Sequence, residues 1–277
     1  MNSALYPQNK LSHKLYAIIN ALVLAIVIWW NYYSNTGNIG GKTVGELSAE
    51  YDNYFTPAGY AFAIWGIIYL ALSAQAIFFL RRAFSSNKES DFLSEIGPYL
   101  IITNIFNAGW LYFWLMENTG ISVVLMLMIL GSLVILVLNL NMERWDAPEK
   151  IIAGVWWPIA IYLGWISVAT IANISAYLAK INWTGPFNEI TWAIIMIAVA
   201  TGLYIFLIWA RSLRESALVG VWALFAIAIR HWDSVASLKI TGLIGAGILL
   251  LATAYHGFQN RMSNPFFPDW AKNQIKK

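Results

Sequence analysis

The chain of 277 residues contains no cysteine, which excludes disulfide bonds, thiolate metal sites and cysteine nucleophiles. Histidine is also scarce. His13, His231 and His256 lie far apart in the sequence, and each is better explained as an interfacial or hydrogen-bonded residue than as a metal or haem ligand. No catalytic acid–base pair is visible either. The sequence therefore gives no sign of a metal cofactor or of a conventional catalytic centre.

Charged residues are also scarce. Charged residues make up 11% of the chain, against about 25% in soluble domains, whereas 59% of the residues are hydrophobic and 16% are aromatic. This composition is that of an integral membrane protein. The first six of the apolar runs given below contain no Asp, Glu, Lys or Arg, which disfavours a proton- or sodium-driven carrier. The net charge of +3 comes from loop residues and does not indicate a nucleic-acid partner.

Eight apolar runs are long enough to cross a bilayer as helices, since a span needs about 20 residues. They cover residues 15–33, 58–80, 99–116, 121–140, 152–178, 190–210, 217–232 and 240–258. With a cytoplasmic N-terminus, 13 of the 17 Lys and Arg residues fall inside and 4 outside, in agreement with the positive-inside rule. We therefore expect an all-α polytopic membrane bundle of about eight transmembrane helices, in a bacterial inner (plasma) membrane, with both chain ends cytoplasmic.

Residues 34–57 form the one long loop between these runs. The loop begins with a glycine-rich stretch, SNTGNIGG, and continues with a mildly acidic segment. Long ordered loops are often functional lids, and a plain connector is the alternative.

Aromatic rings and amides stand in the apolar runs where charge is missing. Helical spacing puts them on one face of each of three runs: Phe62, Trp65 and Tyr69 on the second, Asn107, Trp110 and Trp114 on the third, and Tyr162, Trp165, Ala169 and Asn173 on the fifth. An asparagine in hydrocarbon must find a hydrogen-bond partner, so Asn107 and Asn173 should face the bundle interior and bring Trp110 and Trp165 with them. The converging rings either stack on one another or line a pocket for a flat apolar ligand.

Three motifs carry a resemblance to a known family. Residues 162–173 read YLGWISVATIAN, residues 107–110 read NAGW, and residues 55–69 read FTPAGYAFAIWGIIY. They resemble the fifth-helix signature P-Y-L-x-W-x-S-F-A-x-x-L-N, the third-helix N-x-x-W and the second-helix start F-x-P-P-G-W-x-F-x-P-V-W-T-x-x-Y of the tryptophan-rich sensory protein, or translocator protein, family (TspO/MBR). Ala58 and Tyr60 replace a proline and a tryptophan of that pattern.

The resemblance covers residues 15–182 and implies two parts: a five-helix domain (1–182) and a three-helix extension with a cytoplasmic tail (183–277). It also implies a pocket near one membrane face, closed by the loop of residues 34–57, that binds a porphyrin, a haem-like tetrapyrrole or a sterol-like molecule. No other cofactor is expected. The ligand-binding candidates are Phe55, Pro57, Gly59, Tyr60, Phe62, Trp65, Tyr69, Asn107, Trp110, Trp114, Tyr162, Trp165, Ala169 and Asn173.

Three functions stay open on the sequence. The first is a membrane binding or sensory protein, with a receptor or transport role, for a planar hydrophobic ligand. The second is an enzyme that degrades bound porphyrin under light, with the photochemistry supplied by the ligand. The third is a structural or assembly subunit of a larger membrane complex, or a homodimer. In that case, the helices of the last three runs would form the docking face, and small residues in the last run would permit close helix approach: Gly242, Gly245, Ala246 and Gly247.

Overall fold

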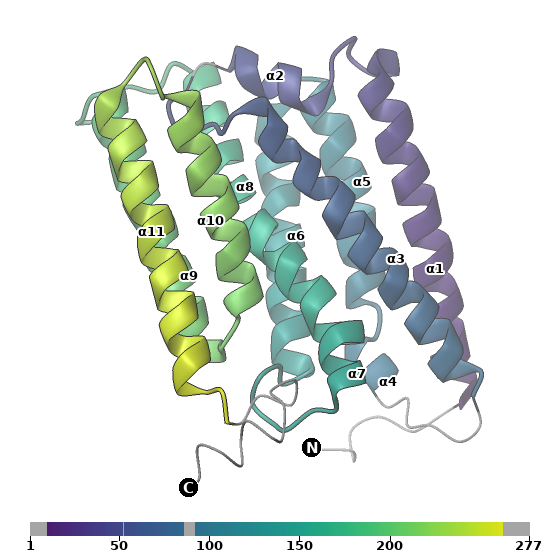
Figure 1. Ribbon diagram of the computed structural model, residues 1–277. Coiled ribbons are helices and arrows are strands. Elements are labelled where there is room, and N and C mark those ends of the chain that lie inside the picture. Colours follow the sequence, from purple (N-terminus) through teal and green to yellow (C-terminus); the bar gives the residue numbers. More distant parts are fainter. Residues whose placement is uncertain (1–9, 52, 86–91, 263–277) are drawn as a thin grey trace, which may run out of the picture.

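The computed structural model describes residues 10–51, 53–85 and 92–262, which form a helical bundle without a strand among them (Figure 1). The long helices are α1 (Lys10–Tyr33), α3 (Ile64–Ala83), α5 (Tyr99–Leu115), α6 (Thr119–Asn139), α8 (Trp157–Lys180), α9 (Glu189–Arg211), α10 (Arg214–Arg230) and α11 (Ala236–Gln259). The predicted all-α polytopic bundle is confirmed. The predicted cytoplasmic tail after residue 262 lies outside the described residues.

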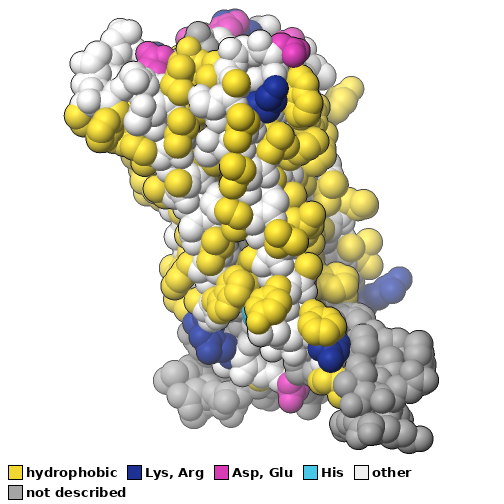
Figure 2. Space-filling model, turned by 60° about the vertical axis from the view of Figure 1, so that its left-hand side comes forward, with side chains coloured by type: hydrophobic (Ala, Val, Ile, Leu, Met, Phe, Trp, Pro, Cys, Tyr) yellow, Lys and Arg dark blue, Asp and Glu magenta, His cyan; other side chains and the backbone are white. Residues whose placement is uncertain are grey.

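Six helical segments of the described chain are long and apolar enough to cross a membrane. They contain α1, α3, α6, α8, α9 and α11. The other two long helices, α5 and α10, have 17 residues each, at the lower limit of about 17 for a span. Figure 2 shows hydrophobic side chains along the height of the molecule, with acidic and basic side chains near its two ends. This distribution is that of a membrane protein, and the crossing of all eight helices stays a prediction.

Helix α8 is the centre of the bundle. In its span 78% of the residues are buried, against 28% for the spans of α1 and α11. Close contact is possible because Gly164 has no side chain: a Cβ atom there would lie 2.7 Å from the backbone oxygen of Ser216 in α10. The hydroxyl of Tyr204, from α9, donates to the Gly164 carbonyl at 2.6 Å. Helices α9 and α10 therefore pack directly on the helix that carries the YLGW motif.

The small residues of α11 are used inside the bundle. A Cβ atom on Gly242 would lie 3.0 Å from the Leu224 carbonyl oxygen in α10, and one on Gly245 would lie 2.8 Å from Oγ1 of Thr201 in α9. Ala246 is buried as well. Three of the four residues predicted as a docking face are thus occupied by neighbouring helices of the same chain.

The predicted long loop contains a short helix, α2 (Val44–Glu50). A capping box starts it: the Thr43 hydroxyl accepts from the Glu46 amide at 3.2 Å, and the Glu46 carboxylate accepts from the Thr43 amide at 2.8 Å. Before it the chain turns at Gly40, with φ of 66°, where a Cβ atom would overlap the Leu115 carbonyl oxygen. Figure 1 shows α2 lying across one end of the bundle.

Shorter elements complete the described chain. They are the π-helical turns η1 (Ser34–Asn38) and η3 (Ile152–Trp156), the 3₁₀ turn η2 (Gly59–Ala63), and the short helices α4 (Phe92–Ile96) and α7 (Glu149–Ile151). The turn η2 leads the chain from the α2 region into α3.

Candidate functional site

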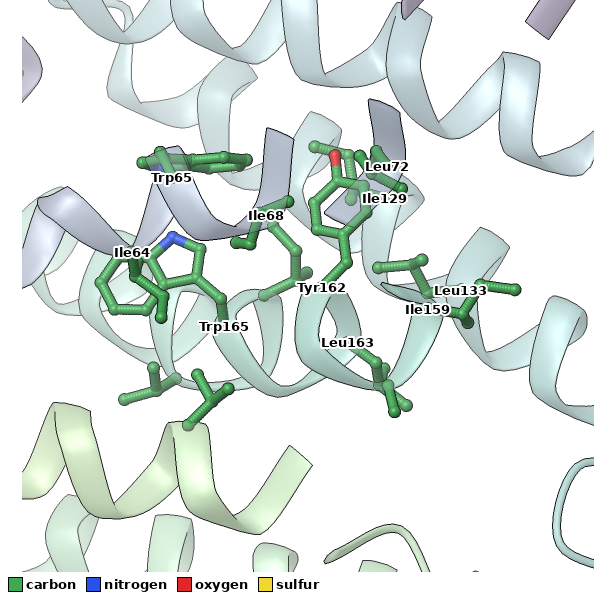
Figure 3. Packing of buried hydrophobic residues seen from close by; sticks show 14 of the residues in the cluster. Ile64, Trp65, Ile68, Leu72, Ile129, Leu133, Ile159, Tyr162, Leu163 and Trp165 are labelled. Carbon is green, nitrogen blue, oxygen red and sulfur yellow. The ribbon is translucent and has the colours of Figure 1, made fainter. Parts of the chain in front are cut away.

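Aromatic rings from α3, α5 and α8 meet inside the bundle. Trp65 of α3 stacks on Trp110 of α5 with 6.0 Å between ring centroids, and its ring edge contacts Tyr162 of α8 at 5.9 Å. The stack continues from Trp65 to Tyr69 at 5.5 Å and from Trp110 to Trp114 at 6.3 Å. Figure 3 shows Tyr162 and Trp165 reaching from α8 toward the part of α3 that carries Trp65. The predicted convergence of rings is present, largely as direct ring contact.

Two buried amides hold these rings in place. The Asn107 side-chain nitrogen donates to the Tyr69 hydroxyl at 3.1 Å. The Trp110 indole nitrogen donates to Oδ1 of Asn173 at 3.0 Å, and the Asn173 nitrogen donates to the Ser122 hydroxyl of α6 at 2.9 Å. Both asparagines face the interior, as expected for amides in an apolar bundle. The bonds fix the rotation of the indole and phenol rings across four helices.

A small cavity of about 30 Å³ remains between this ring cluster and α2. It is lined by Val44, Ser48, Pro57, Phe62, Trp110, Trp114, Met126, Trp165, Val168, Ala169, Ala172 and Asn173. Seven of the fourteen predicted ligand-binding residues are among them. Ligand pockets usually measure roughly 300–1,000 Å³, so this cavity, as it stands, holds about one or two water molecules. We call it the ring-lined cavity.

Helix α2 forms the outer wall of the ring-lined cavity. Its Val44 and Leu47 side chains are buried, and the Trp114 indole nitrogen donates to the Val44 carbonyl at 3.5 Å. The predicted lid segment therefore lies directly over the predicted rings.

Polar contacts on the outer surface fasten α2 to the turn between α5 and α6. The Lys42 ammonium lies 2.5 Å from the Glu50 carboxylate and 3.7 Å from that of Glu117, and the Tyr51 hydroxyl donates to Glu117 at 3.2 Å. The Lys180 ammonium donates to the Glu117 carbonyl. Partial burial, reinforced by the Glu117 charge, raises the pKa of Tyr51 to about 12. We call this group the Glu117 clasp.

Helix α10 fixes the segment that enters α3. The Ala58 amide donates to the Ala226 carbonyl at 3.1 Å, and the Trp222 indole nitrogen donates to the Ala61 carbonyl at 3.1 Å. His231 Nε2 lies 2.9 Å from the Tyr54 carbonyl oxygen. Sequence reasoning missed these contacts because they join groups more than 160 residues apart in the chain, and no residue pattern encodes that pairing.

The remaining predicted residues have different places. Trp65, Tyr69, Asn107 and Tyr162 belong to the ring cluster beside the cavity. Phe55 is fully buried. Gly59 and Tyr60 lie outside the cavity: both are exposed, and the Tyr60 ring contacts Trp222 edge to face at 5.2 Å.

Sequence reasoning also missed cavity residues. Val44 and Ser48 come from α2, Met126 from α6, and Val168 and Ala172 from α8. In the fifth-helix motif, Val168 stands where the family signature has phenylalanine. Its smaller side chain lines the ring-lined cavity.

A larger cavity, of about 820 Å³, is lined by the α6–α7 connection and by residues of α10 and α11. Its lining mixes tryptophans with Glu143, Arg144, Arg214, Glu215 and His256. None of the predicted ligand-binding residues lies there, so we do not assign the ligand to it. Within the described ranges, no group of three or more His, Asp or Glu residues could hold a metal ion.

The sequence was compared with known proteins. A family model described as TSPO-like protein matches residues 17–255. The match runs past residue 182 and takes in α9, α10 and most of α11, which the motif resemblance did not reach. No curated protein and no solved structure matches the chain.

Proposed function

Because the chain belongs to the TSPO-like protein family, we propose that it is a membrane-embedded binding protein for a planar hydrophobic ligand, a tetrapyrrole or a sterol-like molecule. The binding site is the ring-lined cavity beneath α2. The observation that carries this proposal is the lining itself: indole rings of Trp110, Trp114 and Trp165 with small residues between them and a lid on one side. Flat aromatic walls with a few polar groups suit a flat apolar ligand.

Two polar groups of the ring cluster lack a partner among the described residues. The Trp165 indole nitrogen and the Tyr162 hydroxyl are buried, and neither has a hydrogen-bond partner in that part of the chain. An unsatisfied buried donor costs about 1–3 kcal/mol, and native structures rarely keep one without a reason. A ligand that carries an acceptor, such as a carboxylate, a carbonyl or a ring nitrogen, would satisfy the Trp165 N–H group at the cavity wall.

Ligand entry requires α2 to move, since a tetrapyrrole is far larger than the 30 Å³ cavity. The movement exposes Val44 and Leu47, which costs roughly 3–6 kcal/mol at about 1.5–3 kcal/mol for each buried side chain. The exposed ion pairs of the Glu117 clasp add little, about 0–1 kcal/mol each. An open state a few kcal/mol above the closed one is accessible to a ligand that binds it preferentially. Helix α2 is therefore the moving lid of the proposed site.

Titration of protoporphyrin into the purified protein, followed by tryptophan fluorescence, tests the proposal. We expect saturable quenching that weakens at least several-fold in Trp165→Phe, which loses the unpartnered donor. Trp29→Phe is the matched control, because Trp29 is exposed on α1 and stacks on Tyr33 of the same helix. Quenching that does not saturate, or an equal loss of affinity in both variants, would contradict a site beneath α2.

We propose that the ring-lined cavity is the site used whether the protein acts as a receptor, as a transporter or as an enzyme that degrades porphyrin under light. Illumination of the porphyrin complex separates the enzymatic role from the others, since it alone requires a new product. Product formation that persists after Trp65, Trp110 and Trp165 are all replaced by phenylalanine would count against chemistry at this site.

We further propose that the protein lies in a bacterial inner membrane with both chain ends cytoplasmic. Since the chain has no cysteine, single cysteines can report the side of each loop. Thr184→Cys in the α8–α9 connection should react with an impermeant thiol reagent in intact cells, whereas Asp146→Cys should react only after lysis. The reverse pattern would overturn the orientation.

A further inference from the structure

Three amide side chains from three helices meet at a second internal cavity. Asn20 of α1, Gln75 of α3 and Asn104 of α5 are 3%, 1% and 2% exposed. The side-chain oxygen of each has no hydrogen-bond partner within the described ranges of the chain. All three residues line one cavity of about 10 Å³, whose other lining residues are apolar: Leu24, Leu72, Ala76, Phe79 and Leu100. The functional site does not use this cavity, and sequence reasoning did not single out any of the three amides.

The orientation of two of these amides is fixed by their nitrogen atoms. The Asn20 nitrogen donates to the Tyr16 carbonyl at 2.9 Å, and the Gln75 nitrogen donates to the Val155 carbonyl of η3 at 3.0 Å. An amide nitrogen can only donate, so a flipped amide would put an oxygen against each of these carbonyls. The oxygens of Asn20 and Gln75 therefore stay on the acceptor side without a donor from the protein.

We propose that this cavity binds one water molecule, which donates its two hydrogen atoms to two of the three amide oxygens at a time and so links α1, α3 and α5. A cavity of about 10–15 Å³ accommodates one water, and a buried water needs two to four polar partners. The fixed oxygens of Asn20 and Gln75 can only accept, so an occupant that donates hydrogen bonds would satisfy both. The site thus matches a single water in both volume and hydrogen-bonding chemistry.

A small cation would also fit three acceptors, but the surroundings disfavour it. Among the residues that line the cavity none is acidic, so only neutral oxygens would replace the hydration shell of the ion. Moving a charge out of water into an apolar interior is much more costly than moving a neutral molecule. Water meets the same acceptors without that penalty.

The bound water would fasten the middle of α1. This helix has 28% of its span buried, and its other side-chain links to the bundle lie toward its ends. Near one end the His13 ring lies 2.7 Å from the Ser94 hydroxyl, and near the other the Trp30 indole nitrogen donates to the Ala108 carbonyl at 3.1 Å. The water bridge at Asn20 supplies the central attachment.

A density map of the wild-type protein at about 2 Å resolution tests the proposal directly. We expect one peak within about 2.7–3.2 Å of at least two of the three amide oxygens. An empty cavity in such a map would overturn the proposal. Because it uses the unmodified protein, this test does not depend on the folding of a variant.

Substitution gives an independent test. Asn104→Leu removes one acceptor of the water and should lower the melting temperature by about 2–4 °C. Asn139→Leu, on the exposed end of α6, should change it little. In a dry cavity each oxygen is an unsatisfied acceptor, so removal of one would leave the melting temperature unchanged or raise it, which would contradict a bound water. Equal melting temperatures in sodium, potassium, ammonium and choline chloride are expected, and a saturable rise with one small cation would show that the occupant is an ion.

Discussion

Replacing Trp110 by phenylalanine should destabilise the protein by more than its lost volume explains. The Trp110 indole stacks on Trp65 and Trp114, and its nitrogen donates to Asn173 Oδ1 at 3.0 Å. Phenylalanine keeps a ring in the stack but has no donor. The Oδ1 atom of Asn173 would then keep only the longer bond from the Ser122 hydroxyl, at 3.3 Å.

The expected cost follows from these contacts. The smaller ring buries roughly 40 Å² less apolar surface, which costs about 1 kcal/mol at about 25 cal/mol per Å². Loss of the hydrogen bond from the indole to the buried Asn173 oxygen costs about 1–2 kcal/mol more. This value is in the lower part of the range for a buried polar atom that loses its partner, because the bond from Ser122 remains. The sum of about 2–3 kcal/mol corresponds to a fall of roughly 4–12 °C in melting temperature for a chain of this size.

Thermal unfolding of Trp110→Phe, Asn173→Leu and the double variant, all in one detergent, measures the coupling. Either single change leaves a buried polar atom without its partner, whereas the double change removes both partners. The double variant should therefore be at least about 1 kcal/mol more stable than the sum of the single effects predicts. Additivity within about 0.3–0.5 kcal/mol would refute the claim that this hydrogen bond holds the ring cluster. Trp29→Phe, an exposed indole on α1, should change stability by less than about 0.5 kcal/mol.

Three further results are expected. Glu117→Gln weakens the Glu117 clasp on α2, so tryptophan quenching by protoporphyrin, followed by stopped flow, should become faster. Stability should change by less than about 1 kcal/mol, and an unchanged quenching rate would argue against α2 as the lid. Gly164→Ala places a Cβ atom 2.7 Å from the Ser216 backbone and should lower stability by about 1–3 kcal/mol. The control Gly131→Ala, with no atom within 4 Å of its Cβ, should leave the thermal melt unchanged, and equal effects of the two variants would refute the close α8–α10 packing. Burial, reinforced by the Glu215 charge, raises the pKa of Glu143 to about 7, above its ordinary 4.5, so the folded state binds the proton more tightly. The contribution of Glu143 to stability should be largest below about pH 4.5 and be lost as the pH rises through 7; a Glu143→Gln variant with the same dependence of melting temperature on pH would contradict this.

Much of the fold could be predicted from the sequence because lipid imposes simple rules. Each of the eight apolar runs contains most of one long helix, and their ends differ by a few residues from those observed: the run 217–232 corresponds to Arg214–Arg230. The exceptions are the starts of two runs: residues 59–63 of the second form the 3₁₀ turn η2, and residues 152–156 of the fifth form the π-helical turn η3. Local turn geometry of this kind has no signature in hydropathy.

The inward-facing rings could be predicted for a physical reason. An amide in hydrocarbon needs a partner, so Asn107 and Asn173 marked the interior faces of α5 and α8, and the rings on those faces followed. The same argument applies to Asn20, Gln75 and Asn104, which are buried as well.

The size of the cavity and its outer wall could not be predicted. Residue types show that rings converge, but whether they leave space depends on packing distances of about 6 Å between centroids. The contribution of α10 was also invisible, since His231 and Trp222 reach backbone carbonyls of the segment before α3. Contacts between distant segments become evident only when the helices are placed in space.

A density map of the protein in complex with protoporphyrin tests the binding site most directly. We predict planar density between α2 and the faces of Trp110 and Trp165, within hydrogen-bond distance of the Trp165 nitrogen, with α2 shifted away from its closed position. Rings that keep their direct contacts, with the porphyrin on the lipid-facing surface or in the larger cavity beside α10 and α11, would contradict the site.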